Sequence, residues 1–338
     1  MTNKWVRARA PATIANVGPG FDVFALAIRG LGDQIAIRPA PRDSFAVRGV
    51  EADSIPADYS GNTAGIVIDA LRSETGISTP LEVRLRKGVP PGRGLGSSAA
   101  SCAAAAIAFL RAFPESKSLG LAGFLRAAVE GEAAVSGRHY DNVAGALLGG
   151  FVTIASTDPI VLRREPVSSR VHIALAIPET FLRTAVMRTL LPDRVPLADA
   201  ASNVGRAATL ALAIARGDVA LAGRCLEDRL AEPARAPSVP GYAEAREAAA
   251  AAQASGFAIS GSGSTVFALA RNRAIAAEAA RAMCAGFGRQ GVRATPVVTT
   301  VANAIPLREF APPAGLGFSV VEGFPDRPEI VREILPRA

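Results

Sequence analysis

The chain has 338 residues, 49% of them hydrophobic and only 5% aromatic, and a formal net charge of +7. This length suits two domains with a sizeable aliphatic core, and three widely separated cysteines give no spacing typical of a metal site or a disulfide framework. The arginines are scattered and lysines are scarce, so the charge favours a small polyanionic ligand over a nucleic acid.

The N-terminal segment shows no sign of a secretion signal. Residues 1–16 contain early arginines but no continuous apolar run followed by a small-residue cleavage site. The Ala-rich stretch Ser97–Leu110 is too short to span a membrane and is followed by Arg111. We therefore expect a soluble, cytoplasmic protein without a membrane partner.

In the first half, apolar and polar residues alternate in three segments, as they do in half-buried strands. These segments are Trp5–Ala10, Gln34–Arg38 and Leu81–Arg86. Helices are predicted over Thr63–Leu71, from Ser98 to the residue before Pro114, and over Leu121–Val135.

The second half repeats this mixture of strands and helices. Strands are predicted over Phe151–Ser156, His172–Ile177, Ala258–Ser260, Thr265–Ala270 and Thr295–Val301, and helices over Ser202–Ala215, Val219–Leu230 and Arg273–Gly286. The interleaving indicates an α+β class in both halves. The segment 156–169 is the expected domain boundary, which gives domains over 1–165 and 166–310 and an extension over 311–338 whose tail carries no recognisable chemistry.

The strongest motif is a glycine-rich loop at residues 89–100, between a predicted strand and the Ala-rich helix. Gly92, Gly94 and Gly96 would let backbone N–H groups approach a ligand closely, and the N-terminus of the helix adds partial positive charge. The loop lacks the lysine of a Walker A motif, and its third glycine comes one residue too early for a dinucleotide fingerprint. The sequence therefore predicts an anion site, most simply for a polyphosphate.

Residues 90–99 (PPGRGLGSSA) resemble the signature of the GHMP kinases, the superfamily named for galactokinase, homoserine kinase, mevalonate kinase and phosphomevalonate kinase. Two further segments resemble the other superfamily motifs in the right order, at 10–22 (APATIANVGPGFD) and 259–268 (ISGSGSTVFA). The resemblance implies an N-terminal domain like ribosomal protein S5 domain 2 and a ferredoxin-like C-terminal domain. ATP and the acceptor would bind between them.

Within the superfamily, the first motif is similar to that of the homoserine kinases, because sugar kinases carry a Gly-Glu-His stretch there. Segments 139–144 (HYDNVA), 184–192 (TAVMRTLLP) and 231–241 (AEPARAPSVPG) resemble three more motifs of that branch. The resemblance extends over residues 5–305. It implies transfer of the γ-phosphate of ATP to the side-chain hydroxyl of L-homoserine, a step of threonine biosynthesis, and it suggests a homodimer.

The acceptor would need an acid for its ammonium group and strong donors for its carboxylate. Asp22 with Asn16 suits the ammonium, and Arg188 and Arg235 can form forked hydrogen bonds to the carboxylate. Together the resemblance gives a substrate-binding set of Asn16, Asp22, His139, Thr184, Arg188 and Arg235. Taken singly, these residues could equally be a helix cap, a solvated helix residue, or a loop anchor.

The resemblance also assigns the nucleotide site. The ATP-binding residues would be Asn62, Pro90, Gly92, Arg93, Gly94, Leu95, Gly96, Ser97, Ser98, Ala99, Ser262 and Gly263. Mg²⁺ would be held by Ser98 and Glu132, with Glu130 as the alternative, because the spacing from Glu132 to His139 is about one residue shorter than in the family.

The catalytic residues implied by the resemblance are Arg188, Asn142 and His139. Several sister kinases have an aspartate where this chain has Asn142, and an amide cannot accept a proton. The resemblance therefore implies that the hydroxyl proton passes to the γ-phosphate without a dedicated base. Asp141 and His139 remain candidates for a base.

Two other interpretations remain open. The chain could be a GHMP kinase for another small hydroxylated acceptor, although an acid without an ammonium group would leave Asp22 and Asn16 without a purpose. It could also be a kinase-like binding protein without turnover. Threonine resembles homoserine, so competition at the same site is a further hypothesis.

Overall fold

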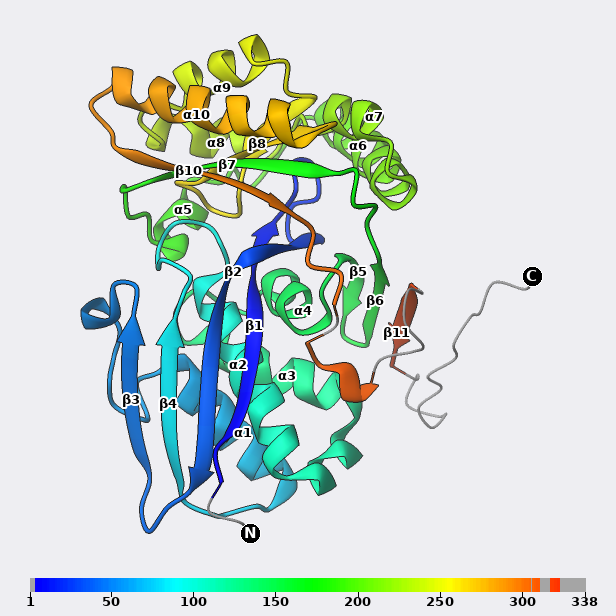
Figure 1. The fold of residues 1–338 in the computed structure, drawn as a ribbon. Helices are drawn as coiled ribbons and strands as arrows, with labels where there is room; N and C mark the ends of the chain where they lie inside the picture. Colours follow the sequence, from blue (N-terminus) through cyan, green and yellow to red (C-terminus); the bar gives the residue numbers. More distant parts are fainter. Residues whose placement is uncertain (1–3, 305, 311–316, 323–338) are drawn as a thin grey trace.

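The protein contains two β-sheets, each covered by helices. The computed structural model describes residues 4–304, 306–310 and 317–322. The larger sheet has seven strands in the order β11-β6-β5-β2-β4-β3, with β1 paired to β2, and the smaller has four in the order β10-β7-β9-β8. The larger sheet and its helices form the lower part of Figure 1, and the smaller sheet forms the upper part. The predicted α+β class with two domains is confirmed.

The larger sheet carries its helices on one face. Its strands are β1 (Val6–Ala15), β2 (Phe24–Pro39), β3 (Ser44–Gly49), β4 (Leu81–Lys87), β5 (Phe151–Thr157), β6 (Ile160–Glu165) and β11 (Phe318–Val321). The helices are α1 (Thr63–Thr75), α2 (Ser97–Ala112), α3 (Gly120–Ala133) and α4 (Tyr140–Leu148), with short 3₁₀ turns η1 (Ala52–Ser54), η2 (Pro114–Leu119) and η4 (Arg308–Phe310).

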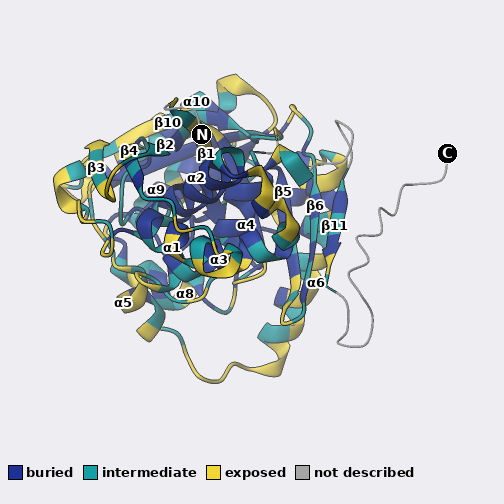
Figure 2. Ribbon diagram, turned by 90° about the horizontal axis from the view of Figure 1, so that it is seen from below, coloured by how far each residue is buried: buried dark blue, intermediate teal, exposed yellow. Residues whose placement is uncertain are grey.

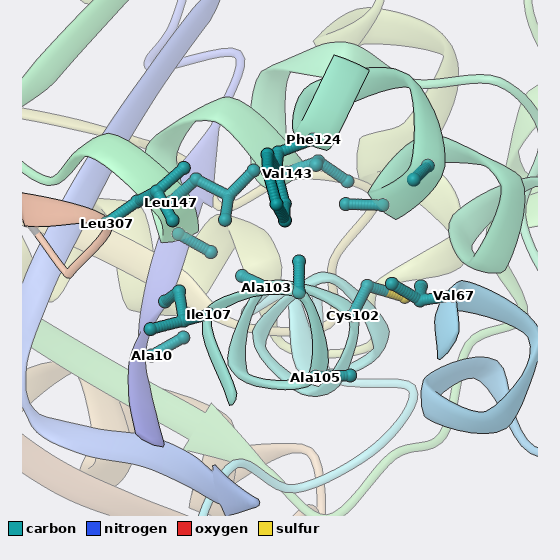
Figure 3. Close-up of a cluster of buried hydrophobic side chains, with 14 of the residues drawn as sticks. Ala10, Val67, Cys102, Ala103, Ala105, Ile107, Phe124, Val143, Leu147 and Leu307 are labelled. Carbon is teal, nitrogen blue, oxygen red and sulfur yellow. The ribbon is translucent and has the colours of Figure 1, made fainter. Parts of the chain in front are cut away.

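Helix α2 is the centre of this domain. All residues from Ala99 to Leu110 are buried, as expected for a helix that is apolar on every side. Its alanines let neighbouring elements approach closely, and Figure 3 shows Cys102, Ala103 and Ile107 of α2 among side chains from α1, α3 and α4. In Figure 2 the same helix is almost wholly buried, whereas much of β3 and α5 is exposed.

The smaller sheet is built from β7 (His172–Pro178), β8 (Gly256–Ile259), β9 (Val266–Ala270) and β10 (Ala294–Thr300). Its helices are α5 (Thr184–Thr189), α6 (Leu197–Arg216), α7 (Val219–Arg224), α8 (Glu232–Arg235), α9 (Tyr242–Ala251) and α10 (Arg273–Arg289), with the turn η3 (Ala236–Ser238).

Strand β7 shows how the two domains are joined. Ala174 and Ala176 pack in a cluster with residues of α9 and α10, whereas Ile173 and Leu175 belong to a cluster that also contains residues of β1 and β2. Because successive side chains of a strand point to opposite faces, β7 is buried by α9 and α10 on one side and, on the other, by the first domain together with α6 and α7. The domains therefore share one apolar cluster.

The structure corrects the interpretation of segment 156–169, which was expected to be a connecting loop. It contains β6, whose Ile160 and Leu162 are buried, and β6 pairs with β11 from the expected extension. The prolines that flank this strand explain why the pattern indicated a loop. The rest of the extension, from residue 323 on, lies outside the described residues.

Other differences concern short elements. The helix predicted over Val219–Leu230 ends at Arg224. Strand β3 and helices α4, α5, α8 and α9 were not predicted as elements, because they are short or, in α9, so rich in alanine that no apolar stripe stands out. Among the described residues no single helix is long and apolar enough to cross a membrane; only α2 taken together with the following helix Pro114–Ala133, bent by 119°, meets that criterion by length and composition.

Candidate active site

The glycine-rich loop between β4 and α2 is fixed through its carbonyl groups. The contacts come from three segments. Leu182 N donates to Gly92 O (2.9 Å), and Thr13 N donates to Leu95 O (3.1 Å). The Gly-Ser turn, residues 260–265 between β8 and β9, supplies Thr265 N to Arg93 O (3.1 Å) and Ser260 Oγ to Gly94 O (2.6 Å). The N–H groups of residues 92–99 donate no hydrogen bond to any part of the chain that the structure describes. Together with the N-terminus of α2, these free donors form an anion site.

Two glycines of this loop are required by close contacts. A Cβ on Gly94 would lie 2.2 Å from the Ser260 carbonyl oxygen, and one on Gly96 would lie 2.0 Å from Thr13 Oγ1 and 2.8 Å from Asn142 Oδ1. Both residues also have positive φ, which favours glycine. The loop is therefore pressed against the Gly-Ser turn on one side and against β1 and α4 on the other.

A buried ion pair holds both ends of the loop, and the sequence analysis missed it. Lys87 Nζ donates to the Asp33 carboxylate, to Ser97 O (2.8 Å) and to Ser101 Oγ (2.9 Å). Asp33 Oδ1 accepts the N–H groups of Gly88 (2.9 Å) and Val89 (3.1 Å). The available signal was the alternation of β4, which places Lys87 on the same buried face as Leu81, Val83 and Leu85.

Several of the predicted ATP residues have side-chain partners within the chain, among them Asn62 and Arg93. Asn62 caps α1: its Oδ1 accepts a hydrogen bond from Ala64 N (3.0 Å), and its Nδ2 donates to Pro56 O (2.7 Å). The amide oxygen and the amide NH₂ group can each form one more hydrogen bond. Arg93 is buried and pairs with Glu51 at 3.1 Å. The remaining predicted residues lie in the loop, in the first turn of α2, or in the Gly-Ser turn.

The predicted metal ligands lie at the α2 and α3 helices. Glu132 is 4% exposed, and its Oε1 accepts a hydrogen bond from Ser136 (2.5 Å) while its Oε2 has no partner. Burial raises the pKa of this carboxyl, opposed by the hydroxyls of Ser136 and Ser98. Among the described residues no three His, Cys, Asp or Glu side chains gather as a metal cage.

An unpartnered buried carboxylate oxygen beside a hydroxyl fits Mg²⁺, which takes one or two ligands from a protein and the rest from phosphates and water. The alternative ligand, Glu130, lies at the surface in an ion pair with Arg138 (2.6 Å). The geometry therefore favours Glu132 over Glu130.

The turn between β1 and β2 carries the predicted ammonium site in unusual backbone geometry. Asn16, Val17 and Asp22 have φ values of 67°, 47° and 56°, a region that costs energy for residues with a Cβ. Asn16 Oδ1 accepts Asp22 N (3.1 Å), and its Nδ2 donates to Gly261 O (3.0 Å). The side chain of Asn16 thus fixes this turn against the Gly-Ser turn.

Asp22, Arg188 and His139 form one hydrogen-bonded group. Arg188, on α5, donates to Asp22 Oδ2 through Nη2 and also through Nη1 (3.1 Å). His139 Nε2 lies 2.8 Å from Ser136 O, and its Nδ1 lies 3.2 Å from Arg188 Nη2. A carbonyl can only accept, so Nε2 carries the proton and Nδ1 accepts from Arg188.

Arg235 reaches the same place from α8. It is 4% exposed, donates through Nη1 to Gly261 O (3.0 Å), and its Nε has no partner. The guanidinium carbons of Arg235 and Arg188 each lie 5.3 Å from the ring centre of Phe21, and burial lowers the pKa of Arg235. A buried cation with an unused donor suits a carboxylate ligand.

The predicted catalytic amide lies between the loop and this charged group. Asn142 Oδ1 accepts a hydrogen bond from the buried Thr13 hydroxyl at 2.6 Å. Its neighbour Asp141 is 3% exposed, and burial together with the nearby Asp22 carboxylate raises the pKa of Asp141 to about 7. Thr184, the last predicted acceptor residue, lies 3.1 Å from Ser262 between hydroxyl oxygens. The structure thus brings the predicted acceptor residues close to the glycine-rich loop at residues 89–100, which we call the phosphate loop from here on.

A separate cavity of about 660 Å³ lies on the C-terminal domain, lined among others by Arg224, Glu232, Tyr242 and Arg246. None of the residues predicted for ATP or acceptor binding lines it. The convergence of polar groups at the phosphate loop therefore identifies the functional site better than cavity size does.

Comparisons with known proteins identify the family of the chain. Residues 62–150 match the family described as GHMP kinases N terminal domain, and residues 210–289 match GHMP kinases C terminal. Homoserine kinase of Halobacterium salinarum is 41% identical over 299 residues, which cover 88% of this chain and 95% of that protein. Homoserine kinase of Thermococcus gammatolerans is 40% identical over 285 residues, covering 84% and 94%.

Solved structures give the same result for the fold. The crystal structure of homoserine kinase from Cytophaga hutchinsonii has a TM-score of 0.79 at 32% identity, covering 89% of this chain and 96% of that chain. Galactokinase of Lactococcus lactis, crystallised with galactose, has a TM-score of 0.64 at 16% identity, covering 89% and 94%. At that identity it shares the fold alone.

Proposed function

The chain belongs to the GHMP kinase family, and on that premise we propose that it transfers the γ-phosphate of ATP to the side-chain hydroxyl of L-homoserine, giving O-phospho-L-homoserine for threonine biosynthesis. The observation that carries the choice of acceptor is the ion pair of Asp22 with Arg188, with the buried Arg235 beside the same Phe21 ring. Relatives about 40% identical over most of the chain are homoserine kinases, which supports the same acceptor.

The acceptor charges match those of the site. In the free protein Asp22 and Arg188 neutralise each other. A zwitterion offers both charges, so its ammonium group takes over from Arg188 at Asp22, and its carboxylate binds Arg188 and Arg235. Thr184, Asn16 and His139 complete the acceptor site. A neutral sugar offers neither charge, so it would leave Asp22 paired with Arg188 and would give the buried Arg235 no carboxylate to bind.

The nucleotide is bound by the loop. The N–H groups of residues 92–99 and the N-terminus of α2 hold the β- and γ-phosphates, while Asn62 and the Gly-Ser turn with Ser262 and Gly263 contact the rest of ATP. Ser98 and Glu132 would hold Mg²⁺, which supplies positive charge to the phosphate oxygens when bound. The buried, unpartnered Glu132 Oε2 supports this role.

Transfer needs alignment and charge stabilisation more than proton abstraction. The acceptor hydroxyl oxygen forms a bond to the γ-phosphorus as the bond to the β-phosphate oxygen breaks, and its proton passes to the transferred phosphoryl group. Arg188 stabilises the charge on the phosphoryl oxygens, and His139 keeps Arg188 in place through a hydrogen bond. The side-chain amide of Asn142, which is oriented by the Thr13 hydroxyl, positions the acceptor hydroxyl.

The domain limits 1–165 and 166–310 remain a proposal, which is supported by the change of sheet between β6 and β7; β11, from the proposed extension, pairs with the first sheet. The family resemblance also suggests a homodimer, and the likeness of threonine to homoserine suggests that threonine competes at the acceptor site.

The test is ADP release with Mg-ATP and a panel of L-homoserine, L-threonine, L-serine, mevalonate, galactose and no acceptor. We expect turnover with homoserine alone. Arg188→Met should lower kcat/KM for homoserine by about 100-fold or more, the scale for losing a charge-stabilising donor. The matched variant Arg183→Met, which changes an exposed arginine one turn earlier, should leave it within about threefold.

Turnover with mevalonate or galactose would keep the ATP site and overturn the acceptor assignment. Absence of turnover with every acceptor, while ATP still binds, would indicate a kinase fold used for binding. Equal losses in the Arg183 and Arg188 variants would contradict the role given to Arg188.

A further inference from the structure

Asn203, on α6, bridges two segments that lie far from it in sequence. It is 2% exposed, and its Nδ2 donates both to Pro19 O (3.1 Å) and to Asp228 Oδ1 (3.0 Å). Its Oδ1 accepts Arg229 N (2.9 Å). A buried amide with all these groups paired holds one relative position of its partners, because any shift leaves a buried polar group unsatisfied.

Asp228 extends this bridge to α8. It is 8% exposed, and its two oxygens accept the N–H groups of Leu230 (2.8 Å), Ala231 (3.0 Å) and Glu232 (2.7 Å). Helix α8 has only four residues, and its N-cap residue, Ala231, makes no side-chain hydrogen bond to the helix. So short a helix is unstable by itself, and the Asp228 carboxylate satisfies the free donors at its start.

Both ends of the bridge lead to the acceptor site. Pro19 lies in the turn that carries Asn16 and Asp22, and α8 ends with Arg235. A Cβ on Gly18 would lie 2.3 Å from Leu226 O, so the turn also packs directly on the segment before Asp228. Among the described residues, Asn203 is the one side chain that hydrogen-bonds both to this turn and to Asp228.

On the ligand side of the site, one backbone carbonyl group links the β1–β2 turn to α8. Gly261 O accepts both Asn16 Nδ2 (3.0 Å) and Arg235 Nη1 (3.0 Å). The turn and α8 are therefore joined twice, once at Gly261 beside the ligand groups and once at Asn203 and Asp228 behind them. Two joints fix both the separation and the relative orientation of the elements that carry Asp22 and Arg235.

We infer that Asn203 and Asp228 are positioning residues for the acceptor, which set the distance between the carboxylate of Asp22 and the guanidinium of Arg235. This inference rests on the proposed function. A zwitterion has its two charges at a fixed spacing, so displacement of one partner by about 1 Å weakens binding and alignment together. The phosphate loop has its own supports in Lys87, Asp33 and Thr13, so nucleotide binding is independent of this bridge.

The test compares Asn203→Leu and Asp228→Asn with the wild type. Leucine keeps the branched shape of the Asn203 side chain, although it is larger, and removes its hydrogen bonds; Asp228→Asn keeps one acceptor oxygen. We expect KM for homoserine to rise about tenfold or more, as for the loss of one to two buried hydrogen bonds, while KM for ATP stays within about twofold. Asp228→Asn is the milder change and serves if Asn203→Leu does not fold.

A matched control separates positioning from stability. Asp218 caps the short helix α7 by accepting Leu221 N (3.0 Å), but it has no link to the acceptor site. Asp218→Asn makes the same chemical change as Asp228→Asn, since it removes a negative charge beside helix N–H groups and keeps one acceptor oxygen, and it should leave KM for homoserine unchanged. Thr209→Val, a second α6 change outside the bridge, should also leave it unchanged.

A double-variant cycle with Arg235→Met asks whether Asn203 acts through Arg235. If it does, Asn203→Leu raises KM for homoserine far less in the Arg235→Met background than in the wild type. Fully additive effects, an unchanged KM for homoserine in folded variants, or equal increases in KM for homoserine and ATP would overturn the inference. Absence of homoserine turnover in the wild type would instead reject the proposed function.

Discussion

Asp141 and Asn142 are neighbours at the start of α4, yet their surroundings give them different chemistry. Asn142 is oriented by the Thr13 hydroxyl and lies against Gly96 of the phosphate loop. Asp141 is buried, uses Oδ1 to accept Asn142 N (2.7 Å), and has a pKa raised to about 7. A carboxyl with that pKa is half ionised at neutral pH and has the acidity of a general base, so its role needs a direct test.

We expect Asp141→Asn to retain most of its turnover, with kcat at saturating homoserine falling by less than about tenfold. Asparagine can still accept the Asn142 N–H, and the proposed transfer sends the proton to phosphate. A general base contributes about 10²–10⁴-fold, and kcat would then rise with pH up to about 7, as Asp141 ionises, and level off above it. Measurement of kcat from pH 5.5 to 8.5 in both proteins decides. A loss of 100-fold, with that rise abolished in the variant, would identify Asp141 as the base.

At the scale of elements, the loop between β4 and α2 depends on contacts as well as on backbone conformation. Gly96 has φ +62° and packs against Thr13 and Asn142, whereas Gly76, at the C-terminus of α1, has φ +71° with nothing within 4 Å of its Cβ position. A comparison of alanine variants at these two glycines therefore distinguishes the cost of a positive φ, which both share, from the cost of a steric clash, which only Gly96 would have.

Gly96→Ala and Gly76→Ala should each lose about 1 kcal/mol of stability from the positive φ. Only Gly96→Ala should also displace Thr13 or the loop, so we expect its kcat/KM for ATP to fall by at least about 100-fold while Gly76→Ala stays within about twofold. Urea unfolding and steady-state kinetics measure the two effects. Similar kinetics in both variants would show that the close packing of Gly96 is unimportant.

At the scale of the whole molecule, the end of the chain returns to the first domain. Val320 pairs with Leu162 and Phe318 with Arg164 across β11 and β6, and Phe318 and Val320 join the apolar cluster around α2. The segment after β10 also crosses back, since Ala302 N donates to Ala27 O (2.9 Å). The first domain therefore requires residues from both ends of the sequence.

Phe318→Ala should lower the free energy of unfolding by about 3 kcal/mol, the scale for truncating a buried aromatic side chain. Val321→Ala changes the same strand at a side chain that is 47% exposed and should lower it by less than about 0.5 kcal/mol. Urea unfolding of both variants makes the comparison, and homoserine turnover below the transition should be unchanged because β11 is not among the site elements. Equal, small losses would show that β11 contributes little to the core.

The sequence by itself determined the features that depend on near neighbours in the chain. Alternation at Leu81, Val83 and Leu85 predicted β4, the spacing of Gly92, Gly94 and Gly96 predicted the anion loop, and the motif at 10–22 indicated the acceptor site. Only the tertiary structure decided the pairs Lys87–Asp33 and Asn203–Asp228 and the pairing of β11 with β6. The physical reason is that a periodic pattern reports which face of an element is buried, whereas the partner of a buried polar group or an edge strand is chosen by segments that come together only when the chain folds.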